Sequence, residues 1–350
     1  MQILVTGGAG YIGSHIALRL LEQNHQVVVI DNLCNSSPLA LQRIEKMSDK
    51  TLHFYHADIC DSSSLENIFS QYTFDAVIHL AGLKSVCDSL RHPLTYYQNN
   101  ISGSLTLLQV MKLHNVRKLI FSSSATVYGI PEKNPVSESA NSGKTTNPYG
   151  ATKHIIEKVL HDMVTAQPTL AVTALRYFNP AGAHPSGLIG EDPLAKPTNL
   201  IPYLFQVATG QQTALPIYGN DYHTPDGTGV RDYIHVMDLA EGHLQALHHL
   251  EPGYRHYNLG TGFGYSVLEI VRRFEALTGK AIRIDQQPRR VGDVAVCLAD
   301  PTLANNKLHW QAERSLDEML VDGWRWQTKN PTGYADNEIC NYASLKEITQ

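Results

Sequence analysis

Tyr149, Lys153 and Ser124 are the residues of this sequence whose types and spacing could do acid–base chemistry. The tyrosine and the lysine are four positions apart at the start of a segment with helical periodicity, so both side chains face the same side of a helix. A free phenol has a pKa near 10 and is a poor base at neutral pH. A positive neighbour favours the phenolate, and at about 4 Å and an effective dielectric of about 20 it contributes about 4 kcal/mol before desolvation. We therefore expect Tyr149 to be a general acid–base whose pKa is lowered by neighbouring positive charge.

A glycine-rich turn close to the N-terminus could hold the pyrophosphate of a dinucleotide. Gly7, Gly10 and Gly13 follow an apolar strand at 3–5, and helical periodicity begins at Tyr11. The first glycine permits a tight turn, the second allows backbone N–H groups to approach the phosphates, and the third allows helix and strand to pack closely. The helix N-terminus would add its unpaired N–H groups and the positive end of its dipole.

Asp31 supports a dinucleotide site. It ends a second apolar segment, 27–30, and follows Gly13 by 18 residues, which suits an acid that binds a ribose 2′-hydroxyl. Its charge would repel a 2′-phosphate, so the sequence favours NAD over NADP. An oxidised nicotinamide would be a second positive neighbour for Tyr149. The alternative is a structural glycine turn with a surface aspartate.

Composition excludes several other classes of protein. The 350 residues suffice for two lobes or one enlarged α/β domain, and the formal charge of −5 with interspersed signs argues against a nucleic-acid partner. We find neither a signal peptide nor a run of 18 apolar residues, so we expect a cytoplasmic protein with no membrane partner. Five scattered cysteines and the spacing of the 17 histidines argue against disulfides and a metal site.

Alternating strands and helices in the first half predict how these residues are positioned. The expected fold is α/β, a Rossmann-type doubly wound parallel sheet with a smaller α/β substrate-binding lobe at the C-terminus. We place the NAD-binding domain at 1–180 and a substrate-binding domain at 181–350, with some segments packing back on the first domain and a frayed tail after about 335. The expected strands of the first domain span 3–5, 27–30, 52–59, 76–82, 118–124 and 172–178.

Polar residues near the ends of these strands are candidate ligand contacts. Asp58 could meet an adenine amino group or cap the following helix, and Lys84 could meet a pyrophosphate. Asp238, at the start of an apolar helix, is expected to be an N-cap.

Several segments together resemble one known family. They are TGGAGYIGSH at 6–15, DNL at 31–33, HLAGLKSV at 79–86, FSSSATVYG at 121–129, YGATK at 149–153, RYFNPAGAHPSG at 176–187, IYGNDYHTPDGTGVRDYIHVMDLA at 217–240 and YNLGTG at 257–262. Through them the chain resembles, over about residues 1 to 334, the extended short-chain dehydrogenase/reductase family and most closely its UDP-glucose 4-epimerases.

The resemblance implies an isomerase that interconverts UDP-glucose and UDP-galactose through a transient 4-keto sugar. Tyr149 would remove the 4-hydroxyl proton while hydride passes from C4 to bound NAD, and Ser124 would hold the oxygen. It implies a cofactor set of Gly7, Gly10, Tyr11, Ile12, Gly13, Asp31, Asn32, Asn35, Ser36, Asp58, Ile59, Leu80, Ala81, Gly82, Lys84, Asn99, Ser122, Tyr149, Lys153 and Phe178. The implied UDP-sugar set is Ser124, Tyr149, Asn179, Asn199, Leu200, Pro216, Ile217, Tyr218, Arg231, Arg290, Asp293 and Cys297.

Two positions bear on substrate and reaction type. Some relatives carry a bulky tyrosine at the position of Cys297, against C2 of the sugar, so a cysteine predicts that UDP-N-acetylglucosamine and UDP-N-acetylgalactosamine are also interconverted. Nucleotide-sugar dehydratases carry an acid pair where this chain has Ala125 and Thr126. The alternatives are an NAD-dependent nucleotide-sugar dehydratase or decarboxylase, and a non-catalytic NAD-sensing regulator. The family also implies a homodimer through helices at about 93–115 and 152–166.

Overall fold

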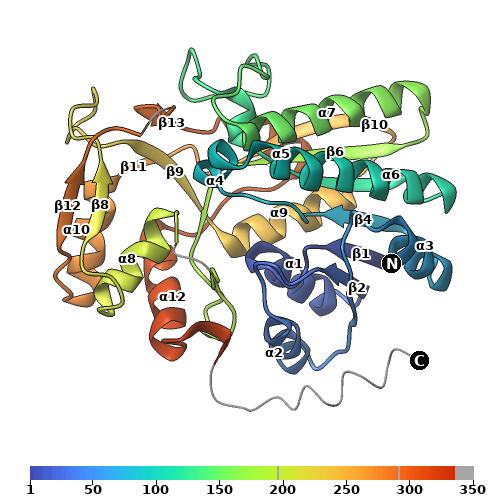
Figure 1. Cartoon of the computed structure of the whole chain (residues 1–350), viewed down its shortest axis with the longest axis horizontal. Helices are drawn as coiled ribbons and strands as arrows, with labels where there is room; N and C mark the ends of the chain where they lie inside the picture. The colour runs from blue at the N-terminus through green and yellow to red at the C-terminus, as the bar shows by residue number, and fades with distance from the viewer. Residues whose placement is uncertain (195–196, 291, 336–350) are drawn as a thin grey trace.

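The computed structural model describes residues 1–194, 197–290 and 292–335, so the tail expected to fray after residue 335 lies outside the described part. A seven-stranded parallel sheet forms the larger lobe, and the predicted fold class is confirmed (Figure 1). The third and fourth strands are shorter than expected. The strand order is β10 (Gly253–Leu259), β6 (Ala171–Tyr177), β5 (Lys118–Ser124), β4 (Ala76–His79), β1 (Gln2–Thr6), β2 (Gln26–Asp31) and β3 (His53–His56).

Alternation along the strands creates one apolar core on each face of this sheet. Ile3 and Val5 contribute to one core and Leu4 to the other, because successive side chains of a strand point to opposite faces. Figure 1 shows the sheet between its two helix layers. The first layer is α1 (Tyr11–Glu22), α2 (Pro38–Ser48) and α9 (Val236–His248), and the second is α3 (Ser62–Gln71), α6 (Gly103–Leu113) and α7 (Pro148–Ala166).

The helix expected at about 93–115 is interrupted by a π-helical segment. It consists of α5 (Pro93–Tyr96), the π-helix η1 (Tyr97–Ser102) and α6, and the short helix α4 (Val86–Arg91) precedes it. None of the described helices is both long and apolar enough to cross a membrane. The other short helices are η2 (Ala125–Tyr128), α11 (Thr302–Leu308) and η3 (Gly333–Ala335).

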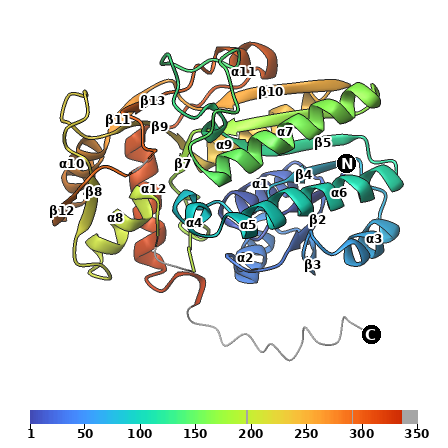
Figure 2. The ribbon, with the colours of Figure 1, turned by 45° about the horizontal axis from the view of Figure 1, so that its top comes forward.

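The smaller lobe stands beside the carboxyl ends of the large sheet, at the left in both ribbon views (Figure 2). Phe205, Phe274 and Trp324 pack against one another at its centre. Strand β9 is the middle of its sheet and pairs with three others. The elements are β7 (Asn179–Ala181), β8 (Leu215–Tyr218), β9 (Val230–His235), β11 (Gly264–Ser266), β12 (Ile284–Gln287), β13 (Val296–Cys297), α8 (Leu200–Ala208), α10 (Val267–Thr278) and α12 (Leu316–Lys329).

The chain crosses between the two lobes more than once. After β9 in the smaller lobe it returns to the larger one, where α9 packs against α1 and β10 pairs with β6. It then goes back to form β11 and α10. The two lobes are therefore joined by continuous backbone at several points, which limits how far they can separate.

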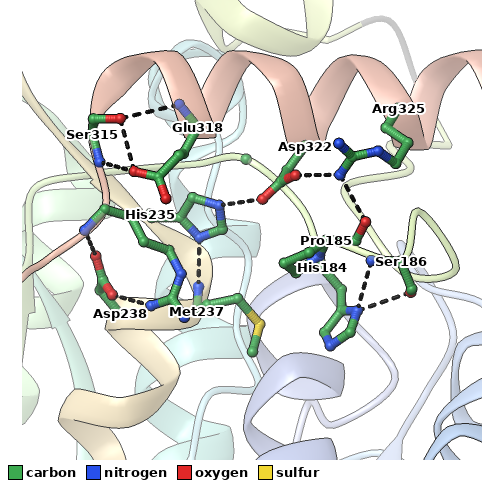
Figure 3. Close-up of polar contacts among 12 residues, drawn as sticks. His184, Pro185, Ser186, His235, Met237, Asp238, Ser315, Glu318, Asp322 and Arg325 are labelled. Carbon is green, nitrogen blue, oxygen red and sulfur yellow. Dashed lines mark hydrogen bonds and ion pairs between the residues drawn. The ribbon is translucent and has the colours of Figure 1, made fainter.

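Helix α12 is tied to the start of α9 by the polar contacts drawn in Figure 3. Its N-terminus carries a capping box of Ser315 and Glu318. One turn later, Asp322 Oδ2 lies 3.4 Å from His235 Nε2. The contact with His235 fixes α12 against β9, the strand that carries the predicted substrate residue Arg231.

The prediction that Asp238 is the N-cap of α9 is wrong. The cap is His235, whose Nδ1 accepts a hydrogen bond from Met237 N at 3.0 Å (Figure 3). Asp238 lies in the first helical turn, where its carboxylate accepts from the backbone N–H groups of Glu313 and Arg314 and pairs with the Arg314 guanidinium. Backbone geometry decides the position, because His235 has the extended ψ of 135° that a cap requires.

Candidate active site

A cavity of about 500 Å³ lies where the carboxyl ends of the large sheet face the smaller lobe. The carboxyl ends of strands are where open α/β sheets bind ligands. Asp58 and Cys297 are the two predicted residues that do not line it. Those that do are Gly7, Gly10, Tyr11, Ile12, Gly13, Asp31, Asn32, Asn35, Ser36, Ile59, Leu80, Ala81, Gly82, Lys84, Asn99, Ser122, Ser124, Tyr149, Lys153, Phe178, Asn179, Asn199, Leu200, Pro216, Ile217, Tyr218, Arg231, Arg290 and Asp293.

The glycine turn after β1 has the shape that a pyrophosphate site requires. Gly7 has φ +73°, and a Cβ there would lie 2.7 Å from Ala81 N. A Cβ on Gly13 would lie 2.2 Å from Gly7 O, so only glycine lets α1 approach the turn. Gly10, the N-cap of α1, supplies no side-chain cap, and residues 10–13 line the cavity. The N-terminal N–H groups of α1 therefore fit a dinucleotide phosphate.

Asp31 is held rigidly at the end of β2. One carboxylate oxygen accepts from Ala9 N at 3.0 Å, and the other accepts from Leu33 N at 2.9 Å and Ser36 Oγ at 2.7 Å. The side chain is thus joined to both the glycine turn and the loop after β2. A ribose hydroxyl is a donor that this carboxylate suits.

Asp58 contributes indirectly to the same end of the cavity. Its Oδ2 accepts from Asn32 Nδ2 at 2.8 Å, and its Oδ1 accepts from Cys60 N at 2.8 Å. The cap of α3 is Asp61, not Asp58. Asp58 therefore orients Asn32, which does line the cavity.

The first turn of α7 positions the predicted acid–base pair. Asn147 caps the helix by accepting from Gly150 N at 2.8 Å, and Pro148 occupies the first helical position. Tyr149 follows at once and Lys153 comes one turn later. The ammonium of Lys153 donates to the backbone oxygen of Ser122 at 2.6 Å and lies 5.9 Å from the centre of the Tyr149 ring.

Ser124 ends β5 on the same wall of the cavity. Its Oγ caps the short helix η2 by accepting from Thr126 N at 3.2 Å, and it also bonds Thr126 Oγ1 at 2.9 Å. The Ser124 hydroxyl also acts on Tyr149, where it favours the phenolate and so opposes the effect of burial on the pKa of the phenol. The structure thus brings the three predicted chemical groups together.

Burial dominates the electrostatics of this group. It raises the pKa of Tyr149 to about 12, and the hydrogen bond with Ser124 acts in the opposite direction. Burial lowers the pKa of Lys153 to about 8, although the charge of Glu157 opposes that change. The protein's own groups therefore leave the pKa of the phenol above its ordinary value, and a positive charge close to the phenol, such as that of an oxidised nicotinamide, would lower it.

The opposite wall carries cationic and aromatic groups from the smaller lobe. Arg231, on β9, lies 3.7 Å from Asp293 Oδ1. The Arg290 guanidinium lies 3.7 Å from the centre of the Tyr218 ring at the end of β8. Such groups suit a diphosphate and a planar base.

Cys297 lies beside this wall without lining the cavity. It pairs in register with Arg231 through β13 and β9, and its side chain packs on the apolar cluster that contains Phe178. Burial raises the pKa of its thiol to about 11, so it stays protonated at neutral pH.

Glu191 and Tyr177 are among the cavity residues that sequence reasoning did not single out. Glu191 pairs with Lys84 at 2.8 Å, so the lysine that was expected to meet a phosphate already has an anionic partner. Tyr177 bonds to His243 Nε2 beneath the catalytic wall. Glu191 falls in a Pro/Gly-rich stretch without periodicity, and Tyr177 is hidden in the strand pattern of β6, so neither could have been singled out.

Comparison with known proteins identifies the class to which this site belongs. The family model described as the NAD dependent epimerase/dehydratase family matches residues 3–260, and the chain belongs to that family. A UDP-glucose 4-epimerase of Yersinia enterocolitica is 59% identical over 334 residues, which cover 95% of this chain and 99% of that protein.

Solved structures agree with this assignment. The UDP-glucose 4-epimerase of Bifidobacterium longum, in complex with NAD+ and UDP, has a TM-score of 0.93 and 49% identity and covers 95% of this chain and 100% of its own. The UDP-Glc/GlcNAc 4-epimerase of Campylobacter jejuni has a TM-score of 0.82 and 35% identity, covering 94% and 99%.

Proposed function

We propose that this protein is an NAD-dependent UDP-glucose 4-epimerase, which interconverts UDP-glucose and UDP-galactose. The observation that carries the proposal is that one cavity joins the glycine turn, the group of Tyr149, Lys153 and Ser124, and the arginines of the opposite wall. These are, in order, the parts needed to hold a dinucleotide, to move a proton and to anchor a nucleoside diphosphate.

The cofactor is NAD, held by the glycine turn, Asp31 and the ends of β4 and β5. When bound it accepts a hydride from C4 of the sugar and returns it, which is chemistry that no side chain can supply. Asp31 excludes a 2′-phosphate by charge. The first turn of α1 neutralises part of the pyrophosphate charge.

Tyr149 moves the proton of the reaction. Its phenolic oxygen takes the proton of the sugar 4-hydroxyl and later returns it to the same oxygen. Ser124 donates a hydrogen bond to that oxygen and so fixes it against the phenol. Lys153, whose pKa of about 8 leaves it mostly protonated at neutral pH, stabilises the phenolate.

Arg231 and Arg290 anchor the diphosphate away from the reacting carbon. Charge-assisted bonds hold that end of the substrate while the hexose, as a 4-keto sugar, turns within the cavity. Rotation of the sugar would present each face of C4 in turn to the same cofactor position, as inversion at C4 requires. The chain thereby fixes one end of the ligand and leaves the other free to rotate.

Product analysis tests this proposal against a dehydratase, a decarboxylase and a non-catalytic NAD sensor. Incubated with UDP-galactose, the protein should form UDP-glucose of unchanged mass, as resolved by chromatography and mass spectrometry. Loss of water or carbon dioxide would favour the first two alternatives. Absence of turnover would favour the sensor. Ala125 and Thr126 offer no carboxylic acid next to Ser124, which supports the epimerase.

The same site supports turnover of 2-acetamido sugars. Cys297 does not line the cavity, but it is the register partner of Arg231, which does, and a cysteine is too small to extend from there toward the substrate as a tyrosine would. The Campylobacter jejuni enzyme named for both sugar types shares the fold over nearly the whole chain. Interconversion of UDP-N-acetylglucosamine and UDP-N-acetylgalactosamine therefore belongs to the proposal.

We also propose a cytoplasmic homodimer. Apolar side chains are exposed along α5, α6 and α7, including Leu94 at 75%, Leu113 at 72% and Ile155 at 37%. A second copy of the chain would cover them, because neighbouring helices present one continuous face. Sedimentation equilibrium should give twice the mass of one chain, and Leu113→Lys should shift the protein toward one chain.

A further inference from the structure

Glu191 is a carboxylate in the cavity wall that the chemistry above does not use. Its side chain is only 11% exposed. One oxygen, Oε1, lies 2.8 Å from Lys84 Nζ and also accepts from Asn199 Nδ2 at 3.3 Å. Lys84 is predicted to contact NAD, and Asn199 is predicted to contact the UDP-sugar. A single oxygen atom therefore connects the two halves of the site.

The backbone under this carboxylate is fixed. Glu191 O accepts from Trp326 Nε1 of α12 at 3.1 Å. The preceding Gly190 lies against the same ring, where a Cβ would come within 2.4 Å of Trp326 Cγ. Its N–H donates to Tyr334 OH at 3.2 Å. Movement at this point is thus confined to the Glu191 side chain.

Each partner of Glu191 retains capacity to bind a ligand. An ammonium has three donors and an amide has two N–H groups and an oxygen, so one contact to Glu191 does not exhaust either. Asn199 stands at the N-cap of α8 but does not cap it, and its side chain is directed to Glu191 instead. The carboxylate therefore orients a donor toward each ligand site.

The position of this charge requires an explanation. A carboxylate in a cavity that accepts two diphosphates repels both unless it is paired. The Glu191 charge also reaches the glycine turn, because it adds to the effect of burial in raising the pKa of Tyr11. A carboxylate at this position is explained if it holds the Lys84 side chain, which is 48% exposed, in one orientation.

We propose that Glu191 is a positioning residue that couples the two ligand sites. A UDP-sugar that binds Asn199 restrains Glu191, and Glu191 then holds Lys84 against the cofactor pyrophosphate. Coupling between two sites is reciprocal, so UDP should slow the release of NAD and NAD should strengthen the binding of UDP. The inference rests on the proposed function.

The test measures NAD release from the holoenzyme by exchange of labelled NAD, with and without saturating UDP. In the wild-type protein UDP should lower the release rate by about fivefold or more. In Glu191→Ala the ratio of the two rates should fall to about one. Glu191→Gln keeps an acceptor for Asn199 without the charge, so its ratio should be intermediate. Glu241→Gln, which removes the carboxylate of an ion pair with Arg19 far from the cavity, should keep the wild-type ratio.

A merely structural role for Glu191 predicts a different result. It would lower the melting temperature or speed NAD release equally with and without UDP, leaving the ratio unchanged. An unchanged ratio in both Glu191 variants, or a wild-type ratio of one, overturns the coupling. Turnover of UDP-galactose by the wild-type protein is measured separately, so loss of the proposed function can be distinguished from loss of coupling.

Discussion

The pKa of Tyr149 in the protein without its cofactor does not suit a base at neutral pH. Burial raises the pKa of the phenol to about 12, which opposes its use as a base at neutral pH. The ammonium of Lys153 lies 5.9 Å from the ring centre and donates its hydrogen bond to the Ser122 carbonyl. The positive charge of oxidised NAD is the remaining contribution. The base is thus expected to be active only when the cofactor is bound and oxidised.

Replacing Tyr149 with phenylalanine removes the proton carrier and little else. We expect epimerisation of UDP-galactose to fall by about 10²–10⁴-fold, the usual contribution of general acid–base catalysis. Steady-state assays check this, with NAD content and melting temperature as measures of folding. Tyr55→Phe, which loses a hydroxyl contact to Tyr72 far from the cavity, is the matched control. Undiminished epimerisation by Tyr149→Phe would contradict the mechanism.

Cys297→Tyr tests the size of the pocket on the C2 side of the sugar. Because a tyrosine fills space next to Arg231, turnover of UDP-N-acetylglucosamine should fall about tenfold or more while UDP-galactose is spared. The ratio of kcat/KM for the two sugars is the measurement. Cys297→Ser, which keeps a small side chain, should leave the ratio unchanged. Equal losses for both sugars would show that this position does not select the substrate.

At the scale of elements, the close approach of α7 to η2 sets the distance between the phenol and Ser124. Gly150 makes that approach possible, because a Cβ there would lie 2.9 Å from Thr126 O. The Thr126 oxygen belongs to the backbone, so it cannot move aside as a flexible side chain would. The N-terminal turn of α7 is therefore fixed from two sides, by this contact and by the Asn147 cap.

Gly150→Ala should separate α7 from η2 by a few tenths of an ångström and misalign Tyr149. We expect kcat to fall by about tenfold or more with a smaller change in KM, since small misplacements of catalytic groups are costly. Steady-state kinetics test it, and Thr165→Ala in the last turn of the same helix is the control. A change in KM alone would indicate that the contact positions substrate and not the phenol.

The elements that the sequence predicts well are those encoded locally. The strand, glycine turn and helix around Gly7 follow from apolar spacing and from positions where a Cβ cannot fit, and the structure contains them as expected. Contacts between distant segments were not predictable. The sequence around Asp238 does not indicate that the backbone N–H groups of residues 313 and 314 bind its carboxylate. The sequence around Lys84 likewise does not indicate its ion pair with Glu191.

At the scale of the whole molecule, neutral histidines are buried in and beside the large sheet. Burial lowers the pKa of His79 and of His15 to about 3, and that of His243 to about 4. His79 Nδ1 lies 2.7 Å from Thr6 Oγ1 and Nε2 lies 2.9 Å from Ser104 Oγ, so each nitrogen of the neutral ring has a hydroxyl partner. The fold therefore binds fewer protons than the unfolded chain below pH 6.5, where free histidines become charged.

This difference predicts that stability is lost as the pH falls below 6.5. The folded pKa values lie below the unfolded ones, so the stabilisation is complete above pH 6.5 and declines toward pH 4. Each histidine contributes a slope of up to about 1.4 kcal/mol per pH unit to the free energy of unfolding. Urea unfolding at pH 7.5, 6 and 5 measures the slope. His79→Gln should reduce the slope by up to about 1.4 kcal/mol per pH unit, which corresponds to one proton. His161→Gln, at an exposed position on α7, is the control and should leave the slope unchanged. An unchanged slope in His79→Gln would show that His79 is protonated equally in both states.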